Sequence, residues 1–183
     1  MVGVYEFKCN VTIRNVVAHG QGSSPVAGHP ERWLDGITFD NVRLTLATDP
    51  NAPFDAATNA INFRYARNLK LQNVNVTWEK PLLKNWQSAL TFESVDGLEL
   101  NGFTGRQAWP ESDAPAVKFL NVTNARLTRA TAPEGTGIFL HAGPGSRAVW
   151  VEGNDFRKAR VPWKIDPIVP TTSVTVRNNQ FPK

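Results

Sequence analysis

The amino-acid sequence predicts an all-β protein that folds as a right-handed parallel β-helix of about seven rungs. Three observations predict it. A short phrase of apolar residues returns every 24 to 32 residues, and a period of this size is typical of a solenoid. Apolar residues alternate with polar ones inside each repeat, as in half-buried strands. Asn or Gly recurs at two fixed positions per repeat, which indicates sharp corners.

The repeated phrase has the form apolar–x–apolar–x–(Asn or Gly)–apolar. Its clear copies are residues 11–16, 37–42, 69–74 and 98–103, and its weaker copies are 125–127, 149–151 and 174–176. We expect their inward side chains to form one continuous apolar column: Ile13, Phe39, Leu71, Leu100, Leu127, Val151 and Val176. A rung of this length fits the large right-handed type, because the left-handed hexapeptide type repeats every six residues.

Two further short strands complete each rung. The strand before the phrase is expected at 4–7, 60–63, 89–92, 116–119 and 137–140. The strand after it shows inward pairs such as Val42 with Leu44 and Val74 with Val76. A rung therefore consists of three strands separated by about three corners, and strands of successive rungs lie parallel and in register.

Two columns of Asn and Gly mark two of these corners. The first column precedes the phrase and comprises Asn10, Gly36, Asn68, Gly97 and Asn124. The second lies inside it and comprises Asn15, Asn41, Asn73, Gly102, Gly153 and Asn178. Asn and Gly accept left-handed backbone angles at low cost. Stacked Asn side chains are also expected to share hydrogen bonds from rung to rung.

Variation in rung length is assigned to a single connection, between the third strand and the next first strand. The expected connections are 18–35, 47–59, 79–88, 104–115, 131–136 and 157–172. Because rungs stack, we expect these loops to emerge on one side of the cylinder. A solenoid that carries its irregular loops on one side usually binds there.

Length and composition limit the remaining possibilities. The 183 residues suit one domain, 1–183, which we expect to lack N-terminal rungs of a longer β-helix. No apolar run is long enough to span a membrane, and no signal peptide is recognisable. Cys9 is alone, so no internal disulfide is expected, and neither a metal-ligand spacing nor a cofactor motif is found. A net charge of +4 favours an anionic partner, although a solvated basic surface explains it equally well.

Aromatic and basic residues gather in the predicted loops. Five of the six tryptophans lie in or beside these loops: Trp33, Trp78, Trp86, Trp109 and Trp163. Trp150 instead points outward from a strand. Exposed indoles suit the C–H faces of sugar rings, and the alternative is that they fold back over the cylinder. Basic residues share the loops, namely Lys80, Lys84, Arg106, Arg157, Lys158, Arg160 and Lys164; they could pair with carboxylates of a sugar or remain solvated.

Catalytic groups are hard to assign. Glycoside hydrolysis needs two neighbouring carboxylates, and the outward acids Asp40 and Glu99 are expected two rungs apart. His19 has no matching carboxylate, so a general acid/base role is not favoured. No catalytic residue is assigned.

The segments 10–16, 36–44, 89–103 and 116–129 resemble the later rungs of the polygalacturonase-like pectinases, glycoside hydrolase family twenty-eight. The resemblance implies a secreted or periplasmic protein that cleaves pectic chains with inversion. The family's Asn-x-Asp and Asp-Asp motifs are absent from this sequence, and Glu6-Phe7-Lys8 matches its Arg-x-Lys only at Lys8. With the loop residues, this gives a candidate substrate-binding set of Lys8, Trp78, Lys80, Trp86, Arg106, Trp109, Trp163 and Lys164.

Three functions remain open. The first is the C-terminal portion of a pectin-degrading enzyme that keeps part of a polysaccharide groove without the catalytic carboxylates. The second is a non-catalytic β-helix module for polysaccharide binding or assembly. The third is a complete enzyme with unrecognised acids. An anionic polysaccharide is the expected partner, nucleic acid and membrane are not, and self-association through the ends of the β-helix is plausible.

Overall fold

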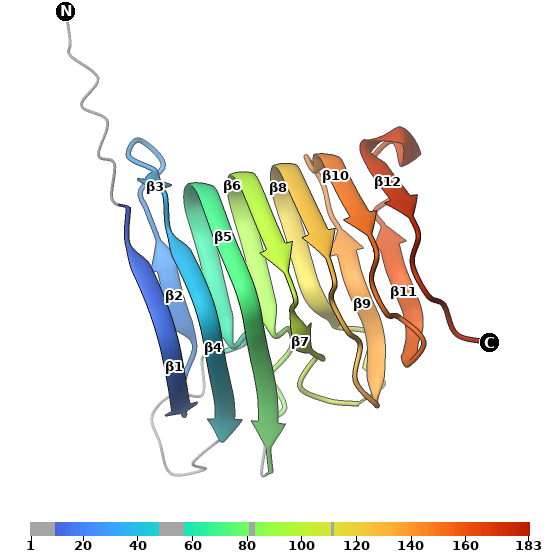
Figure 1. Cartoon of the computed structure of the whole chain (residues 1–183), viewed down its shortest axis with the longest axis horizontal. Coiled ribbons are helices and arrows are strands. Elements are labelled where there is room, and N and C mark those ends of the chain that lie inside the picture. The colour runs from blue at the N-terminus through green and yellow to red at the C-terminus, as the bar shows by residue number, and fades with distance from the viewer. Residues whose placement is uncertain (1–9, 48–56, 81–82, 111) are drawn as a thin grey trace, which may run out of the picture.

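A computed structural model of the chain describes residues 10–47, 57–80, 83–110 and 112–183, and it confirms the parallel β-helix. Every ladder between its named strands is parallel. Figure 1 shows the chain advancing from β1 to β12 while front strands run downward and rear strands upward, the sense of a right-handed coil. Within the described residues, no helix is long and apolar enough to cross a membrane.

The three longest strands, β5, β6 and β8, lie in the middle of the stack. In chain order, the described strands are β1 (Thr12–Gly20), β2 (Ser24–Ala27), β3 (Leu34–Asp35), β4 (Thr38–Ala47), β5 (Ile61–Glu79), β6 (Leu90–Asn101), β7 (Thr104–Gly105), β8 (Pro115–Thr128), β9 (Thr136–Ala142), β10 (Arg147–Glu152), β11 (Ala159–Ile165) and β12 (Val174–Arg177), with one 3-10 turn, η1 (Thr171–Ser173). Seven of them form one row in the order β1-β4-β5-β6-β8-β10-β12. Seven stacked strands enclose about six full turns of the coil.

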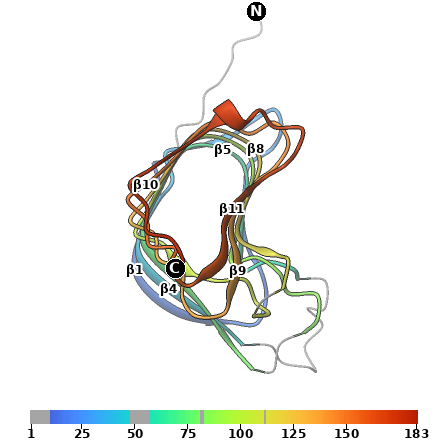
Figure 2. The ribbon, with the colours of Figure 1, turned by 90° about the vertical axis from the view of Figure 1, so that its right-hand side faces the viewer.

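Each turn has three walls, which we number in chain order. The first wall contains β2, residues 61–64 of β5, 90–93 of β6, 115–120 of β8, β9 and β11. The second wall contains the repeated phrase and forms the row of seven strands. The third wall contains the ends of β1, β4 and β5 together with β7. Viewed along the stack in Figure 2, the turns superimpose around one closed outline.

The inward column of the second wall is aligned as predicted. Ile13 pairs in register with Phe39, Phe39 with Leu71, and the register continues through Leu100, Leu127, Val151 and Val176. On the first wall Phe63 and Phe92 stack with their rings 4.9 Å apart and nearly parallel. Both rings are fully buried, so the core runs along the inside of the coil.

The corners also follow the prediction. All eleven Asn and Gly residues of the two predicted columns have positive φ, between 41° and 75°. Because the chain bends at single residues in this way, β5 passes through three walls without losing its ladder. Asn41 Nδ2 donates to Asn15 Oδ1 at 2.8 Å, so one step of the expected amide ladder is present. A third column of positive φ at Tyr65, Ser94 and Asn121, which was not predicted, separates the first wall from the second.

The predicted single loop side needs a correction. Two of the expected connections, 18–35 and 157–172, contain first-wall strands, β2 and β11. The loops that follow these strands therefore leave the coil at the corner between the first and second walls. Figure 2 shows η1 at this corner, on the opposite side of the outline from the start of β9. The predicted strand 4–7 lies outside the described residues.

Candidate functional site

Three of the predicted tryptophans come together on the side where the third wall leads into the first. Trp78 lies next to the last residue of β5. Its ring centre lies 5.4 Å from that of Trp86, and its Nε1 donates to the Arg106 carbonyl at 2.9 Å. Trp86 is only 2% exposed. Trp109 is 37% exposed, and its Nε1 donates to the Leu83 carbonyl at 3.2 Å. Trp86 therefore packs as part of the core. Of these three indoles, Trp109 has the most exposed surface.

Arg106 holds this loop together. Its guanidinium donates to the carbonyls of Gln107 and Ala108 at 2.7 and 2.6 Å, and burial lowers its pKa. Gln107 is completely buried and clamps the next rung, because its Nε2 donates to the Gly135 carbonyl and its Oε1 accepts from the Gly137 N–H. A guanidinium committed to carbonyls in this way is poorly placed to meet a ligand carboxylate.

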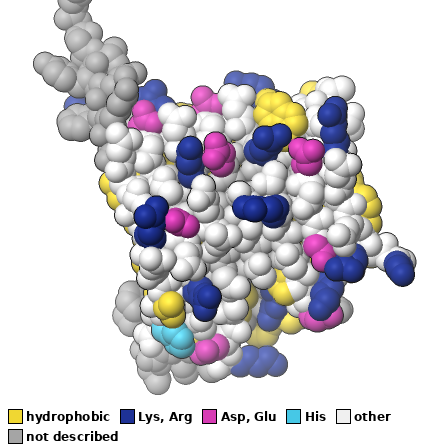
Figure 3. All heavy atoms as spheres, viewed as in Figure 1, with side chains coloured by type: hydrophobic (Ala, Val, Ile, Leu, Met, Phe, Trp, Pro, Cys, Tyr) yellow, Lys and Arg dark blue, Asp and Glu magenta, His cyan; other side chains and the backbone are white. Residues whose placement is uncertain are grey.

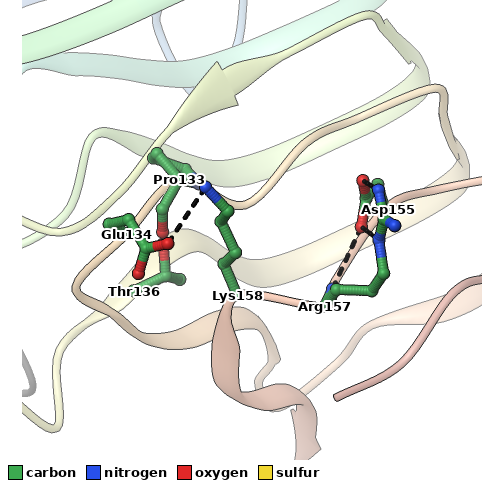
Figure 4. Close-up of polar contacts among 6 residues, drawn as sticks. All are labelled: Pro133, Glu134, Thr136, Asp155, Arg157 and Lys158. Atoms are coloured by element: carbon green, nitrogen blue, oxygen red, sulfur yellow. Dashed lines mark hydrogen bonds and ion pairs between the residues drawn. The ribbon is translucent and has the colours of Figure 1, made fainter. Parts of the chain in front are cut away.

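Other charged residues of these loops pair with one another. Figure 4 shows Lys158 reaching Glu134, at 3.0 Å, and Arg157 hydrogen-bonded to Asp155, at 2.7 Å between Nη2 and Oδ2. The side chain and then the N–H of Arg157 lower the pKa of Asp155 to about 2. Lys80 is exposed, and Lys8 lies outside the described residues.

Trp33 and Trp163 do not lie on the loop side, so the expectation of one tryptophan-lined face is wrong. Trp33 belongs to the loop after β2, where its Nε1 donates to the Pro30 carbonyl at 3.1 Å. Trp163 lies in β11, partly buried against the core, with its ring 5.5 Å from that of Phe181. Proximity in sequence to a long connection did not determine which wall these residues would occupy.

The outer face of the first wall carries a row of polar side chains that sequence reasoning missed. In register from rung to rung, this row comprises Asn62, Thr91, Lys118, His141 and Lys164. We call its last three members the basic column. Of these, only Lys164 had been a candidate, and the structure places it on a strand rather than in a loop. The equal separation of 23 residues between Lys118, His141 and Lys164 was the signal that could have revealed the column.

The basic column combines two lysines with a histidine. Among the described residues, neither Lys118 nor Lys164 takes part in a salt bridge. Burial, followed by the charges of these two lysines, lowers the pKa of His141, and Asp166 opposes the effect. Two ammonium groups therefore flank a histidine that is largely neutral at neutral pH.

A groove of about 370 Å³ continues from the basic column toward the start of the chain. Its polar lining includes Asn62, Arg64, Gln87, Thr91, Glu93 and Lys118. Within it, Thr91 Oγ1 donates to Asn62 Oδ1 at 2.5 Å, and Arg64 forms a salt bridge with Glu93 at 3.1 Å. Hydrogen-bond donors and acceptors thus lie together along the first wall, next to Lys118 of the basic column. We call this surface, with the basic column, the first-wall groove.

The acids that could serve in hydrolysis already have partners within the protein. Asp40 pairs with Arg14 at 2.8 Å, and Glu99 with Lys70 at 3.8 Å. Asp96 accepts from Thr123 Oγ1 at 2.5 Å, and this hydrogen bond is the largest cause of its lowered pKa. A general acid needs a raised pKa, and the pKa of Asp96 is instead lowered. Within the described residues, no group of three His, Cys, Asp or Glu side chains could hold a metal ion.

Comparison with protein-family models and with curated proteins gave no match to this chain.

Proposed function

We propose that this chain binds an anionic polysaccharide along the first-wall groove and does not cleave it. The basic column carries the proposal, because Lys118, His141 and Lys164 lie in one row parallel to the axis of the stack. Successive strands of a sheet are about 4.8 Å apart, so the three cationic or ionisable groups form a straight line rather than a cluster. A linear arrangement of this kind suits an extended, regularly charged chain.

The groove beside the column suits the rest of such a polymer. Asn62, Thr91 and Gln87 offer amide and hydroxyl groups of the kind that bind sugar hydroxyls. The lysines supply charge for carboxylates of the polymer. The resemblance to polygalacturonase-like pectinases makes galacturonan the first polymer to test, and a chain derived from such an enzyme would retain binding of this type.

The absence of cleavage is proposed from the state of the acids. Glu93, the carboxylate in the groove, is paired with Arg64, and Asp96 has a lowered pKa. Asp96 is therefore poorly suited to protonate a leaving group, and Glu93 is already committed to Arg64. These carboxylates favour a binding role over the alternative of a complete enzyme. A binding role is compatible both with a separated C-terminal portion of an enzyme and with an independent polysaccharide-binding module.

The first experiment measures binding of polygalacturonate to the full chain and to the double variant Lys118→Gln/Lys164→Gln. A matched control is Lys70→Gln/Lys84→Gln, which removes the same charge from other surfaces. Two exposed charge contacts of about 0.5–1 kcal/mol each correspond to roughly tenfold weaker binding for the first variant. Equal affinities of the two double variants would contradict the assignment of the groove.

The second experiment incubates the chain with polygalacturonate and measures newly formed reducing ends. We expect binding without any increase above the buffer control. Release of reducing ends that increases with protein concentration would contradict the non-cleaving role. The location of the binding surface is tested separately, by the first experiment.

A further inference from the structure

The outer face of the second wall carries an exposed tryptophan outside the first-wall groove. Trp150 lies on β10, is 42% exposed, and follows Lys70, Glu99 and Arg126 in one outward row of successive rungs. We infer that Trp150 and the groove beside it form a second binding site, for an uncharged sugar ring. This site differs from the first-wall groove in its position and in the charge of its ligand.

A hollow lies between this outward row and the adjacent corner. Its volume is about 420 Å³, and the corner residues that line it are Asn68, Gly97 and Asn124. Gly97 has φ +75°, and a Cβ there would approach Asn68 Oδ1 to 3.3 Å. The missing side chain at Gly97 therefore deepens the hollow between its two asparagine neighbours. The volume is within the range of small-ligand sites, about 300–1,000 Å³.

The charges in the row that leads to Trp150 are balanced by ion pairs. Lys70 faces Glu99 at 3.8 Å, and Arg126 faces Glu152 at 3.4 Å. Figure 3 shows this face of the molecule, with Lys and Arg side chains interspersed among Asp and Glu over β4 to β12. The site thus has donors and acceptors beside an indole but little net charge. A pyranose ring matches it, with C–H groups against the indole and hydroxyl groups toward the charged side chains.

Other occupants match less well. An acidic ligand would meet Glu99 and Glu152 as well as the cations, whereas the basic column offers cations without paired acids. A protein partner would bury an apolar centre depleted of charged residues, whereas here three charged side chains share the row of one aromatic ring and Glu152 pairs with one of them. Balanced charge along the row that ends at a single exposed indole is therefore the observation that favours an uncharged sugar.

The test follows the indole N–H signals of the ¹⁵N-labelled chain during titration with neutral tetrasaccharides of galactose, xylose and arabinose. The chain has six tryptophans, and the Trp150→Phe variant assigns the signal that it loses. We expect the Trp150 signal to shift and to saturate at millimolar concentration with at least one of these sugars. The signal of Trp86, which is buried, serves as the internal reference and should not move.

Matched variants separate this site from the others. Trp150→Ala should weaken sugar binding about tenfold or more. Trp109→Ala, which removes another exposed indole, should leave it unchanged, as should Lys118→Gln/Lys164→Gln. Because Trp150 is exposed, its removal should preserve the backbone amide spectrum, which confirms folding.

Three results would overturn the inference. The first is that the Trp150 signal does not shift at tens of millimolar neutral sugar. The second is that it shifts only with galacturonate oligomers. The third is that it depends on protein concentration in the absence of sugar. The last would identify contact between copies of the chain. If the chain does not bind polygalacturonate but the Trp150 signal still responds to neutral sugar, the proposed function is rejected and the inference of this second site is retained.

Discussion

Nδ2 of Asn154 donates to Oδ1 of Asn179 at 2.8 Å, joining two adjacent rungs through a pair of amides, one buried and the other partly buried. Asn154 is 1% exposed, yet both ends of its side chain are hydrogen-bonded. Its Oδ1 accepts from the Ala130 N–H at 2.8 Å, and its Nδ2 also donates to the Leu127 carbonyl at 3.1 Å. The amide thus satisfies the backbone of the preceding rung at a corner that the chain must turn.

Asn154→Ala should destabilise the protein strongly. The substitution leaves the buried Ala130 N–H and Leu127 carbonyl without their partners, at about 1–3 kcal/mol for each unsatisfied group. We expect a loss of about 3 kcal/mol in the free energy of unfolding, measured by urea denaturation. Gln180→Ala, at an exposed amide of the last described rung, should change it by less than about 0.5 kcal/mol. Similar losses in both variants would show that the amide pair is not a structural contact.

Ala148→Gly should stabilise the protein. Ala148 has φ +52°, and this conformation costs a residue with a Cβ about 1–2 kcal/mol. Replacing Ala148 by glycine removes this cost, but the unfolded chain then has greater conformational freedom, which offsets about 0.4–1 kcal/mol of the gain in stability. The net effect expected in thermal unfolding is a gain of roughly 0.5–1 kcal/mol. Ala142→Gly, in strand β9 where φ is not positive, should instead lower stability.

Asp155 should titrate with a pKa of about 2, well below its ordinary value of 3.8. Because the folded pKa is the lower one, the group contributes stability above pH 3.8, and this contribution is lost as pH falls toward 2. The contribution is small because Arg157 is exposed and Asp155 is only partly buried. NMR titration of the carboxyl carbon measures the pKa directly. In Arg157→Gln it should return toward 3.8, and an unchanged pKa would exclude Arg157 as the cause.

Binding of a polyanion to the first-wall groove should strengthen as pH falls below 7. Burial and then the charges of Lys118 and Lys164 lower the pKa of His141, and Asp166 alone among the identified charges raises it. A bound polyanion offsets the lysines, so it favours the charged imidazolium and binding takes up a proton. Dextran sulfate is a suitable probe because its charge does not change in this range. Its dissociation constant should fall between pH 7 and pH 5.

The control for this pH dependence is His141→Gln. The variant should bind dextran sulfate at pH 7 much as the original chain does and should lose the increase at pH 5. In the unliganded protein the same histidine acts in the opposite direction. Its folded pKa is below the ordinary 6.5, so the unfolded state gains protons first and stability decreases as pH falls through 6.5. A pH response that persists in the variant would assign the effect to other groups.

The sequence was sufficient for the architecture because Asn and Gly mark corners by their conformational preference. It did not reveal the corner column that begins at Tyr65 and Ser94, because tertiary contacts impose positive φ there on residues that do not favour it. It also missed β2 and β11. Each contains a proline, Pro25 or Pro162, which weakens the pattern of a strand.

The candidate site was harder to predict than the fold. Lys118 and Lys164 are 46 positions apart in the chain and become close only through the register of β8, β9 and β11. That register depends on where each loop rejoins the first wall, which composition does not specify. Trp86 was expected on the surface of a loop, but the path of that loop places its side chain in the core. Local patterns therefore located the corners, and long-range register determined the surface.

The constant rise of the stack gives the basic column one more property. Lys118 and Lys164 are two rungs apart, which sets their spacing at about 9.6 Å along the axis. A compact anion such as phosphate can touch both ammonium groups only if the two lysine side chains bend toward each other and lose conformational freedom. A chain whose carboxylates recur at a matching distance can contact both without that cost, and the constant rise of the coil thereby favours ligands of matching periodicity.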